Sequence, residues 1–231
     1  MQEDINYGKA ALLHSGARGK EKNLAAFVTY WSSMRKGHAV PRRTDIDPRG
    51  IEALLENAFI AEKIAPGLAR LRIAGTHLSD LMGMEVRGMP ISAFIAPEQR
   101  ELLSELLVEV FDRPAIVKIN LESPSGVGRR ALKGTLLMLP LRSDLGDTSR
   151  ALGCFLTDGL VGRTPRRFDI ISHSVEAIAG AEADTKPSVA QVEPTQETGF
   201  AEKPRRFDTA PQKHASERPY LRLVQADTAE D

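Results

Sequence analysis

The segment Leu68–Gly83 constrains the fold of this chain most strongly, because a strand pattern in it runs through a glycine directly into a short helix. Apolar and basic residues alternate from Leu68 to Ile73, and this period of two indicates a strand with one buried face. Gly75 permits a sharp turn of the backbone, and Thr76 is placed to cap the helix that follows. We interpret this junction as part of a sensor-type domain rather than of an enzyme.

An amphipathic helix is predicted between Asn23, a candidate N-cap, and Gly37, a candidate C-terminal stop. Its apolar face is formed by Leu24, Phe27, Val28, Trp31 and Met34. We expect this face to pack on a sheet of the same chain or on its copy in a second subunit. Trp31 then belongs to the core, and a partner-binding role for its ring is the alternative.

The remaining pattern predicts five strands joined by helices. We expect strands at residues 59–64, 68–74, 115–123, 130–141 and 151–158, and helices at 76–82 and 97–112. Two strands, a helical crossover and three strands give an α+β fold in which helices cover one face of an antiparallel sheet. Pro140 fits poorly inside a central strand and is expected at a bulge or at the strand end.

The chain divides into one folded domain with extensions. Residues 1–22 lack sustained periodicity and are expected to form a mobile arm, and residues 23–162 form the domain. The spacing of Ile171, Val175 and Ile178 favours one more helix over residues 163–180. Residues 181–231 hold five of the 14 prolines and few large apolar groups, so we expect a disordered C-terminal tail.

Composition limits the class of protein. The 31 Lys and Arg residues balance the 31 Asp and Glu residues, so no overall field attracts nucleic acid or an anionic membrane. The single cysteine, Cys154, cannot form an intrachain disulfide, and no run is apolar enough for a signal peptide or a membrane span. We expect a soluble, cytoplasmic protein that binds no nucleic acid.

A longer pattern surrounds the strand-to-helix junction. Tyr30-Trp31 lies upstream, the run PRRTDIDP follows at 41–48, and Gly75-Thr76 and Gly83 come after it. Over residues 23–162 the chain resembles a PAS-like family of stand-alone alphaproteobacterial proteins with the pattern YW…PxRxDxDP…GT…G. The resemblance implies a PAS-like five-stranded antiparallel sheet with a helical crossover, and a signalling or regulatory role without an output domain of its own.

The resemblance also implies a cavity between the sheet and the crossover helices. The candidates for its lining are Ile73, Leu78, Leu81, Leu106, Val117, Ile119, Leu136 and Phe155. His77 follows the strand end at the cavity mouth, where it could bind haem or sense pH, and a surface or capping histidine is the alternative. Without a ligand, the same apolar positions are ordinary core.

Signatures of catalysis and of cofactors are weak. The five histidines show no HxxH or HxxxH spacing, and the Ser, His and Asp side chains within 76–80 lie too close on one helix to face one another. No Asn-Cys-Arg-Phe motif surrounds Cys154, which we interpret as a small buried apolar residue. We expect no catalytic residue, no metal site and no enzymatic activity, and the sequence carries no signature of a flavin or haem site that would identify a cofactor.

Cationic residues supply the remaining candidate surfaces. The run 125–130, SGVGRR, resembles a phosphate-cradling loop, but it joins two strands and therefore favours a hairpin turn. We predict one surface that binds an anion or a partner, formed by Arg42, Arg43, Arg129 and Arg130.

The sequence Pro-Arg-Arg-Phe-Asp occurs twice, at 165–169 and at 204–208. The residues of this predicted partner motif are Arg166, Arg167, Phe168, Arg205, Arg206 and Phe207. Two copies on one chain could bind a partner with raised avidity, and chance repetition is the alternative.

Three functional hypotheses remain. The first is a PAS-like signalling module that binds a small ligand, a signalling protein or both. The second is a ligand-free scaffold that dimerises through the N-terminal helix and binds partners through the tail. An enzyme ranks third, and we expect a homodimer.

Overall fold

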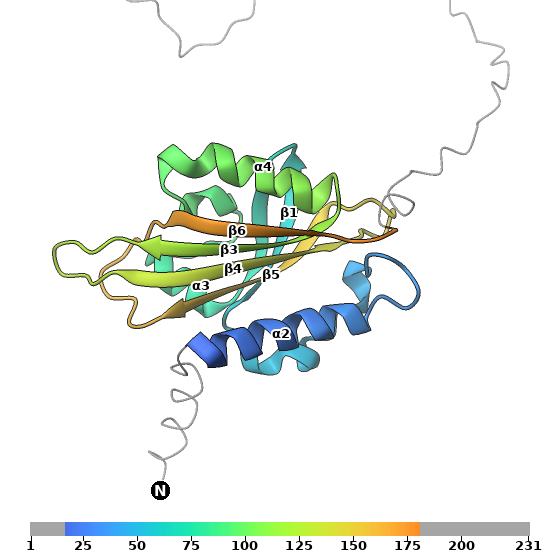
Figure 1. Cartoon of the computed structure of the whole chain (residues 1–231), viewed down its shortest axis with the longest axis horizontal. Coiled ribbons are helices and arrows are strands. Elements are labelled where there is room, and N and C mark those ends of the chain that lie inside the picture. The colour runs from blue at the N-terminus through green and yellow to red at the C-terminus, as the bar shows by residue number, and fades with distance from the viewer. Residues whose placement is uncertain (1–16, 181–231) are drawn as a thin grey trace, which may run out of the picture. The chain divides into compact units, whose positions relative to one another are not determined.

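The structure, a computed structural model, describes residues 17–180 (Figure 1). Six strands in this part of the chain form one antiparallel sheet in the order β2-β1-β5-β4-β3-β6. They are β1 (Ala58–Ala65), β2 (Leu68–Ala74), β3 (Ala115–Ser123), β4 (Leu132–Leu141), β5 (Arg150–Asp158) and β6 (Asp169–Ala177). The tail expected at 181–231 and most of the arm expected at 1–22 lie outside the described residues.

The crossover helices lie on one face of this sheet, as the sequence predicted, and the N-terminal helix and the 3-10 helix at 48–54 cover the other face. The α-helices are α2 (Ala17–Ser33), α3 (Thr76–Met82) and α4 (Arg100–Phe111), and the 3-10 helices are η1 (Arg43–Asp45), η2 (Pro48–Leu54), η3 (Ile91–Phe94) and η4 (Pro97–Gln99). We call the face under α3, η3 and α4 the inner face and the face under α2 and η2 the outer face. Figure 1 shows α4 and α2 on opposite sides of the strands.

The helix α2 begins at Ala17, six residues before the predicted N-cap Asn23, so residues 17–22 are helical and do not belong to an arm. Its apolar side contacts β4 and β5 on the outer face, with Leu24, Phe27, Trp31 and Met34 buried there. Of the two packings that the sequence left open, on the chain's own sheet or on its copy in a second subunit, the structure shows the first.

The Trp31 side chain is the anchor of α2. Its ring is 1% exposed, and its indole Nε1 donates a hydrogen bond to the carbonyl oxygen of Pro140 at 2.9 Å. Pro140 lies one residue before the end of β4, as predicted for a strand end. The ladder between β3 and β4 stops at Met138, so the missing N–H of Pro140 interrupts no bond to β3.

Aromatic side chains fill the inner face. The Phe155 ring lies 5.7 Å from the Phe94 ring and 5.1 Å from the Phe168 ring, measured between centroids. The Phe59 ring lies across its β5 neighbour Gly153, where an added Cβ would come within 2.0 Å of the ring. A glycine at position 153 is therefore required for this core to close.

The prediction of a helix over residues 163–180 is wrong, because residues 169–177 form β6 and extend the predicted five strands to six. The backbone of β3 would otherwise present unpaired groups at this edge, and β6 pairs with it from Ala115 to Glu122. Ile171 and Val175, whose spacing suggested a helix, are 62% and 41% exposed. Their spacing therefore does not mark a buried face.

Replacing Trp31 by Ala removes a buried indole and its hydrogen bond to β4. We expect the free energy of unfolding to fall by roughly 3 to 5 kcal/mol, measured by chemical denaturation. Ser32→Ala, at an exposed position of the same helix, should change it by less than about 0.5 kcal/mol. Equal stability of the Trp31→Ala protein and the native chain would contradict this packing.

Candidate functional site

A polar pocket of about 260 Å³ lies where the first turns of α2 and α3 meet the end of β5. Its lining is formed by Lys20, Asn23, Glu56, Asn57, Thr76, His77, Asp80 and residues 156–161. We call it the His77 pocket.

The backbone at Gly75 makes this pocket possible. Gly75 is the N-cap residue of α3, so Thr76 is the first helical residue and not the cap that the sequence predicted. An added Cβ on Gly75 would lie 2.3 Å from the carbonyl oxygen of Leu55 and 2.2 Å from that of Glu56. The close approach lets the backbone N–H of His77 donate to the Glu56 oxygen at 2.9 Å, which fixes the start of α3 against β1.

His77 is half-buried and faces the end of β5. Its Nε2 lies 3.0 Å from the hydroxyl oxygen of Thr157, within hydrogen-bonding distance. Burial lowers the pKa of His77, while the negative charges of Asp80 and Glu56 oppose this shift without cancelling it. A neutral imidazole, able to donate at one nitrogen and accept at the other, is the form favoured in the pocket.

Asn57 brings an unsatisfied acceptor to the same pocket. The residue is 5% exposed, and its Nδ2 donates to the carbonyl oxygen of Phe155 at 3.2 Å. Its Oδ1 is buried and has no hydrogen-bond partner within the described residues. A buried amide oxygen without a donor costs free energy, so this atom is a candidate contact for a bound group.

The charges around the pocket are mainly negative. Glu56, Asp80 and Asp158 contribute three carboxylates, and Lys20 contributes one ammonium group. The Lys20 Nζ pairs with Asp158 Oδ2 at 2.6 Å, which joins α2 to the end of β5. Two carboxylates of the lining remain without a cation from the lining itself.

The residues predicted to line a PAS cavity mostly lie in the inner core. Seven of them, Leu78, Leu81, Leu106, Val117, Ile119, Leu136 and Phe155, belong to one packed cluster. Ile73 does not, because its partner is Ile60 on the outer face and it is 50% exposed. Between β1 and β2, Ile60 pairs with Ile73 and Ala61 pairs with Leu71, so Arg72 has no partner in β1. This bulge in β2 turns the Ile73 side chain away from the inner core.

The structure divides the predicted surface of four arginines into two groups. Arg42 and Arg43 contact Arg142, directly after the end of β4. Arg129 and Arg130 precede the start of the same strand. The two pairs therefore lie at opposite ends of a ten-residue strand and do not combine into one surface.

The first copy of the repeated pentapeptide is built into the fold. Arg166 and Phe168 are 0% exposed, so they are not available to a partner as predicted, and only Arg167 of the three is exposed. The phenyl ring belongs to the aromatic core, which explains why an aromatic residue is needed there. The second copy, with Arg205, Arg206 and Phe207, lies outside the described residues.

The YW and DP pieces of the longer pattern have structural roles. The Tyr30 hydroxyl donates to the carbonyl oxygen of Asp47 at 2.7 Å and accepts from the N–H of the same residue at 2.8 Å. The Asp47 side chain accepts from the N–H of Arg49 and caps η2, which begins at Pro48. These residues hold the chain returning from α2 against that helix.

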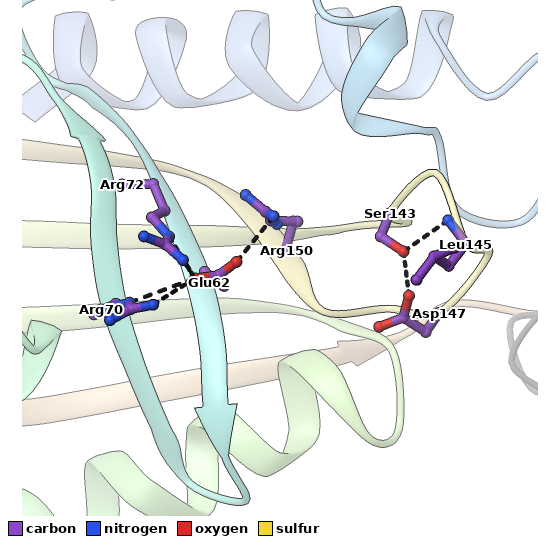
Figure 2. A network of polar contacts seen from close by, with 7 residues as sticks. All are labelled: Glu62, Arg70, Arg72, Ser143, Leu145, Asp147 and Arg150. Carbon is purple, nitrogen blue, oxygen red and sulfur yellow. Dashed lines mark hydrogen bonds and ion pairs between the residues drawn. The ribbon is translucent and has the colours of Figure 1, made fainter. Parts of the chain in front are cut away.

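A second polar cluster lies on the outer face of β2, β1 and β5. Figure 2 shows the Glu62 carboxylate between the guanidinium groups of Arg70, Arg72 and Arg150, the last at 2.9 Å. Burial tends to raise the pKa of Glu62, but the hydrogen bond from Arg72 and the charges around it outweigh burial, so the pKa is lowered. This network joins three strands.

Beside it, the loop between β4 and β5 is closed by its own side chains. Ser143 donates its hydroxyl hydrogen to Asp147 and accepts from the N–H of Leu145 at 3.1 Å, as Figure 2 also shows. The loop thus has partners for its polar groups without a ligand.

Comparison with protein families assigns the fold. The model of the PAS domain matches residues 19–156, more than half of the chain, from the first turn of α2 to within two residues of the end of β5. The chain belongs to the PAS domain family. A comparison with curated proteins found no match.

Two further observations describe the PAS domain and its flanking elements. Residues 17–180 contain no group of three or more His, Cys, Asp or Glu side chains that could hold a metal ion. None of the helices in this part of the chain is long and apolar enough to cross a bilayer.

Sequence reasoning identified His77 but missed the residues that surround it in the PAS domain. Asn57 directly precedes the apolar run 58–61 that begins β1, and Thr157 and Asp158 follow the apolar run 151–156 of β5. A polar residue beside an otherwise apolar run is the signal that could have found them. Lys20 was assigned to the mobile arm.

The lowered pKa of His77 predicts a pH dependence of stability. As the pH falls through the unfolded value of about 6.5, the unfolded chain takes up the proton before the folded PAS domain does. Stability present above pH 6.5 is therefore lost as the pH approaches the folded pKa. In His77→Gln, the loss of stability between about pH 7.5 and 5.5 should be smaller.

His173→Gln, on an exposed residue of β6, provides the control and should keep the native pH dependence. Stability at each pH is measured by urea denaturation. If both variants lose stability with acid to the same extent as the native chain, His77 is not desolvated in the folded state.

Burial raises the pKa of the Cys154 thiol to about 12, so the thiolate is scarce in the folded domain. We expect iodoacetamide at about pH 8 to label Cys154 at least about 1,000-fold more slowly in native buffer than in guanidinium chloride. Mass spectrometry measures both rates. Comparable rates would mean that β5 opens locally without global unfolding.

Proposed function

We propose that the PAS domain of this chain is a signalling module that recognises a small polar ligand in the His77 pocket. The observation that carries the proposal is that Asn57, whose buried Oδ1 lacks a donor, is one of the residues that line the pocket. A ligand N–H or O–H at this atom would satisfy it, at a site where desolvation strengthens each hydrogen bond.

The chemistry of the lining favours a ligand with hydrogen-bond donors. Glu56 and Asp80 supply acceptor oxygens, and the neutral ring of His77 adjusts to a donor or an acceptor. The volume of about 260 Å³ lies just below the usual range of small-molecule pockets, so a compact metabolite bearing an amine or several hydroxyl groups fits best.

The position of the pocket supports a route for the signal. Lys20 and Asn23 belong to α2, whereas His77 belongs to α3 and Thr157 to β5. A ligand that touches all three elements binds best in one arrangement of α2 on the sheet. It would thereby stabilise that arrangement, and a partner protein that contacts α2 would respond to it.

We propose that the His77 pocket binds and does not catalyse. His77 and Thr157 resemble the base and hydroxyl of a hydrolase, and their separation of 3.0 Å would suit one. Among the described residues, however, Asp80 accepts no hydrogen bond from the His77 ring that would orient it. The pair therefore lacks the third group that holds such a base in place.

A ligand-free dimerising scaffold is the second candidate, and the free edge of β6 favours it. The residues from Ile171 to Ala177 are all exposed, and the strand lies at the end of the sheet. Edge strands with exposed backbone groups pair readily with a second chain. In this candidate the exposed edge, and not α2, joins two copies into a homodimer.

Native and denaturing mass spectrometry of the full chain, purified from the cells that produce it, tests the first candidate. We expect extra mass under native conditions that disappears on denaturation. Asp80→Asn and Thr157→Val should each lower the retained fraction about tenfold, because each removes a contact in a desolvated site. Asp144→Asn, in the exposed loop after β4, is the matched control and should retain it fully.

A dimer mass without any retained molecule would reject the ligand hypothesis and support the scaffold. Retention that is equal in all three variants would place the bound molecule elsewhere on the chain.

A further inference from the structure

A second cavity, of about 490 Å³, lies between the β3–β4 hairpin and the segment that leads into β6. Its charged side chains are Arg129 from the hairpin and Arg163 and Arg167 from the segment, and none of the residues that line it is acidic. We call it the arginine groove. Its charge is opposite in sign to that of the His77 pocket.

Two arginines join the walls of the groove. Arg129 donates from Nη1 to the carbonyl oxygen of Pro165 at 3.4 Å, across from the hairpin to the segment. In the other direction, Arg166 donates from Nη1 to the carbonyl oxygen of Arg130 at 2.9 Å and from Nε to that of Val161 at 2.6 Å. The groove is therefore formed before any ligand arrives.

The buried Arg166 adds positive charge that nothing in the described residues neutralises. The residue is 0% exposed, and its Nη2 is buried without a hydrogen-bond partner. Burial lowers the pKa of Arg166, and the positive charge of Arg129 adds to this effect, so the two guanidinium groups repel each other. An anion bound beside Arg129 would reduce this repulsion.

The Glu62 network shows what the arginine groove lacks. There, three arginines share one half-buried carboxylate (Figure 2). In the groove, Arg129, Arg163 and Arg167 form no ion pair with any residue between 17 and 180. Three like charges that converge on one cavity without a counter-charge in its lining are the arrangement expected of an anion site.

We propose that the arginine groove binds a small molecule that carries a diphosphate group. Each guanidinium fork can donate two parallel hydrogen bonds to a phosphate, and the hydroxyl of Thr164 in the lining can donate one more. Three cations match the two to three negative charges of a diphosphate. The arginine groove shares no lining residue with the His77 pocket, and the proposal does not rest on the function proposed for that pocket.

Titration calorimetry of the full chain with pyrophosphate tests the assignment. We expect saturable one-to-one binding that persists at about 150 mM NaCl. Arg163→Gln and Arg167→Gln should each weaken it roughly tenfold, and the triple variant that adds Arg129→Gln should abolish it. Arg49→Gln, at an exposed arginine of η2, is the matched control and should leave the affinity unchanged.

Further variants distinguish recognition of the phosphates by guanidinium groups from attraction by positive charge alone. Arg163→Lys and Arg167→Lys keep the charge but lose the fork, so we expect weakened binding in each. Full affinity in both, or an equal loss in Arg49→Gln, would overturn the proposal. Binding of pyrophosphate that vanishes at about 150 mM NaCl in the native chain would overturn it too.

A further titration distinguishes a small molecule from a phosphorylated protein as the source of the phosphates. Binding by a doubly phosphorylated peptide without binding of pyrophosphate would mean that the groove recognises a modified protein, and the assignment to a small molecule would be wrong. If the triple variant does not fold, as judged by circular dichroism, the two exposed single variants still decide the outcome. The variants of the arginine groove decide this assignment whether or not the His77 pocket holds a ligand.

Discussion

The close approach of Gly75 to the carbonyl oxygens of Leu55 and Glu56 determines much of what this PAS domain can do. It brings the first turn of α3 against the chain that enters β1, so that His77 faces the end of β5. It also leaves Asn57 buried between the two. Any side chain at position 75 would separate these elements, and the polar pocket would lose the geometry that makes it a candidate site.

The local pattern of the chain was sufficient to predict most of the fold. The hairpin of β1 and β2, the helix α3 and the strand β3 have the predicted bounds within one residue. In β3, for example, buried residues alternate with less buried ones along the whole strand, as its sequence pattern does. The strand β6 was missed because its residues are mostly exposed, and it forms by pairing with the free edge of β3, a contact that no local periodicity encodes.

The candidate sites were harder to predict than the fold, since they depend on contacts between distant segments. A bulge at Arg72 moved Ile73 out of the core cluster that contains the other seven predicted positions. Arg129 was identified, but its neighbours in space, Arg163 and Arg167, come from a segment expected to be helical. A residue's type suggests what it can bind, whereas the tertiary structure decides which residues act together.

The segment from residue 159 to residue 167 contributes to both cavities. Leu160 and Val161 line the acidic one, Arg163 and Arg167 line the basic one, and the Val161 carbonyl accepts a hydrogen bond from Arg166. A displacement of this segment at one cavity would change the geometry of the other cavity. Thermodynamic linkage then makes the effect of each ligand on the affinity for the other reciprocal. With both cavities filled, this short stretch would make the domain a detector of the coincidence of two ligands of opposite charge.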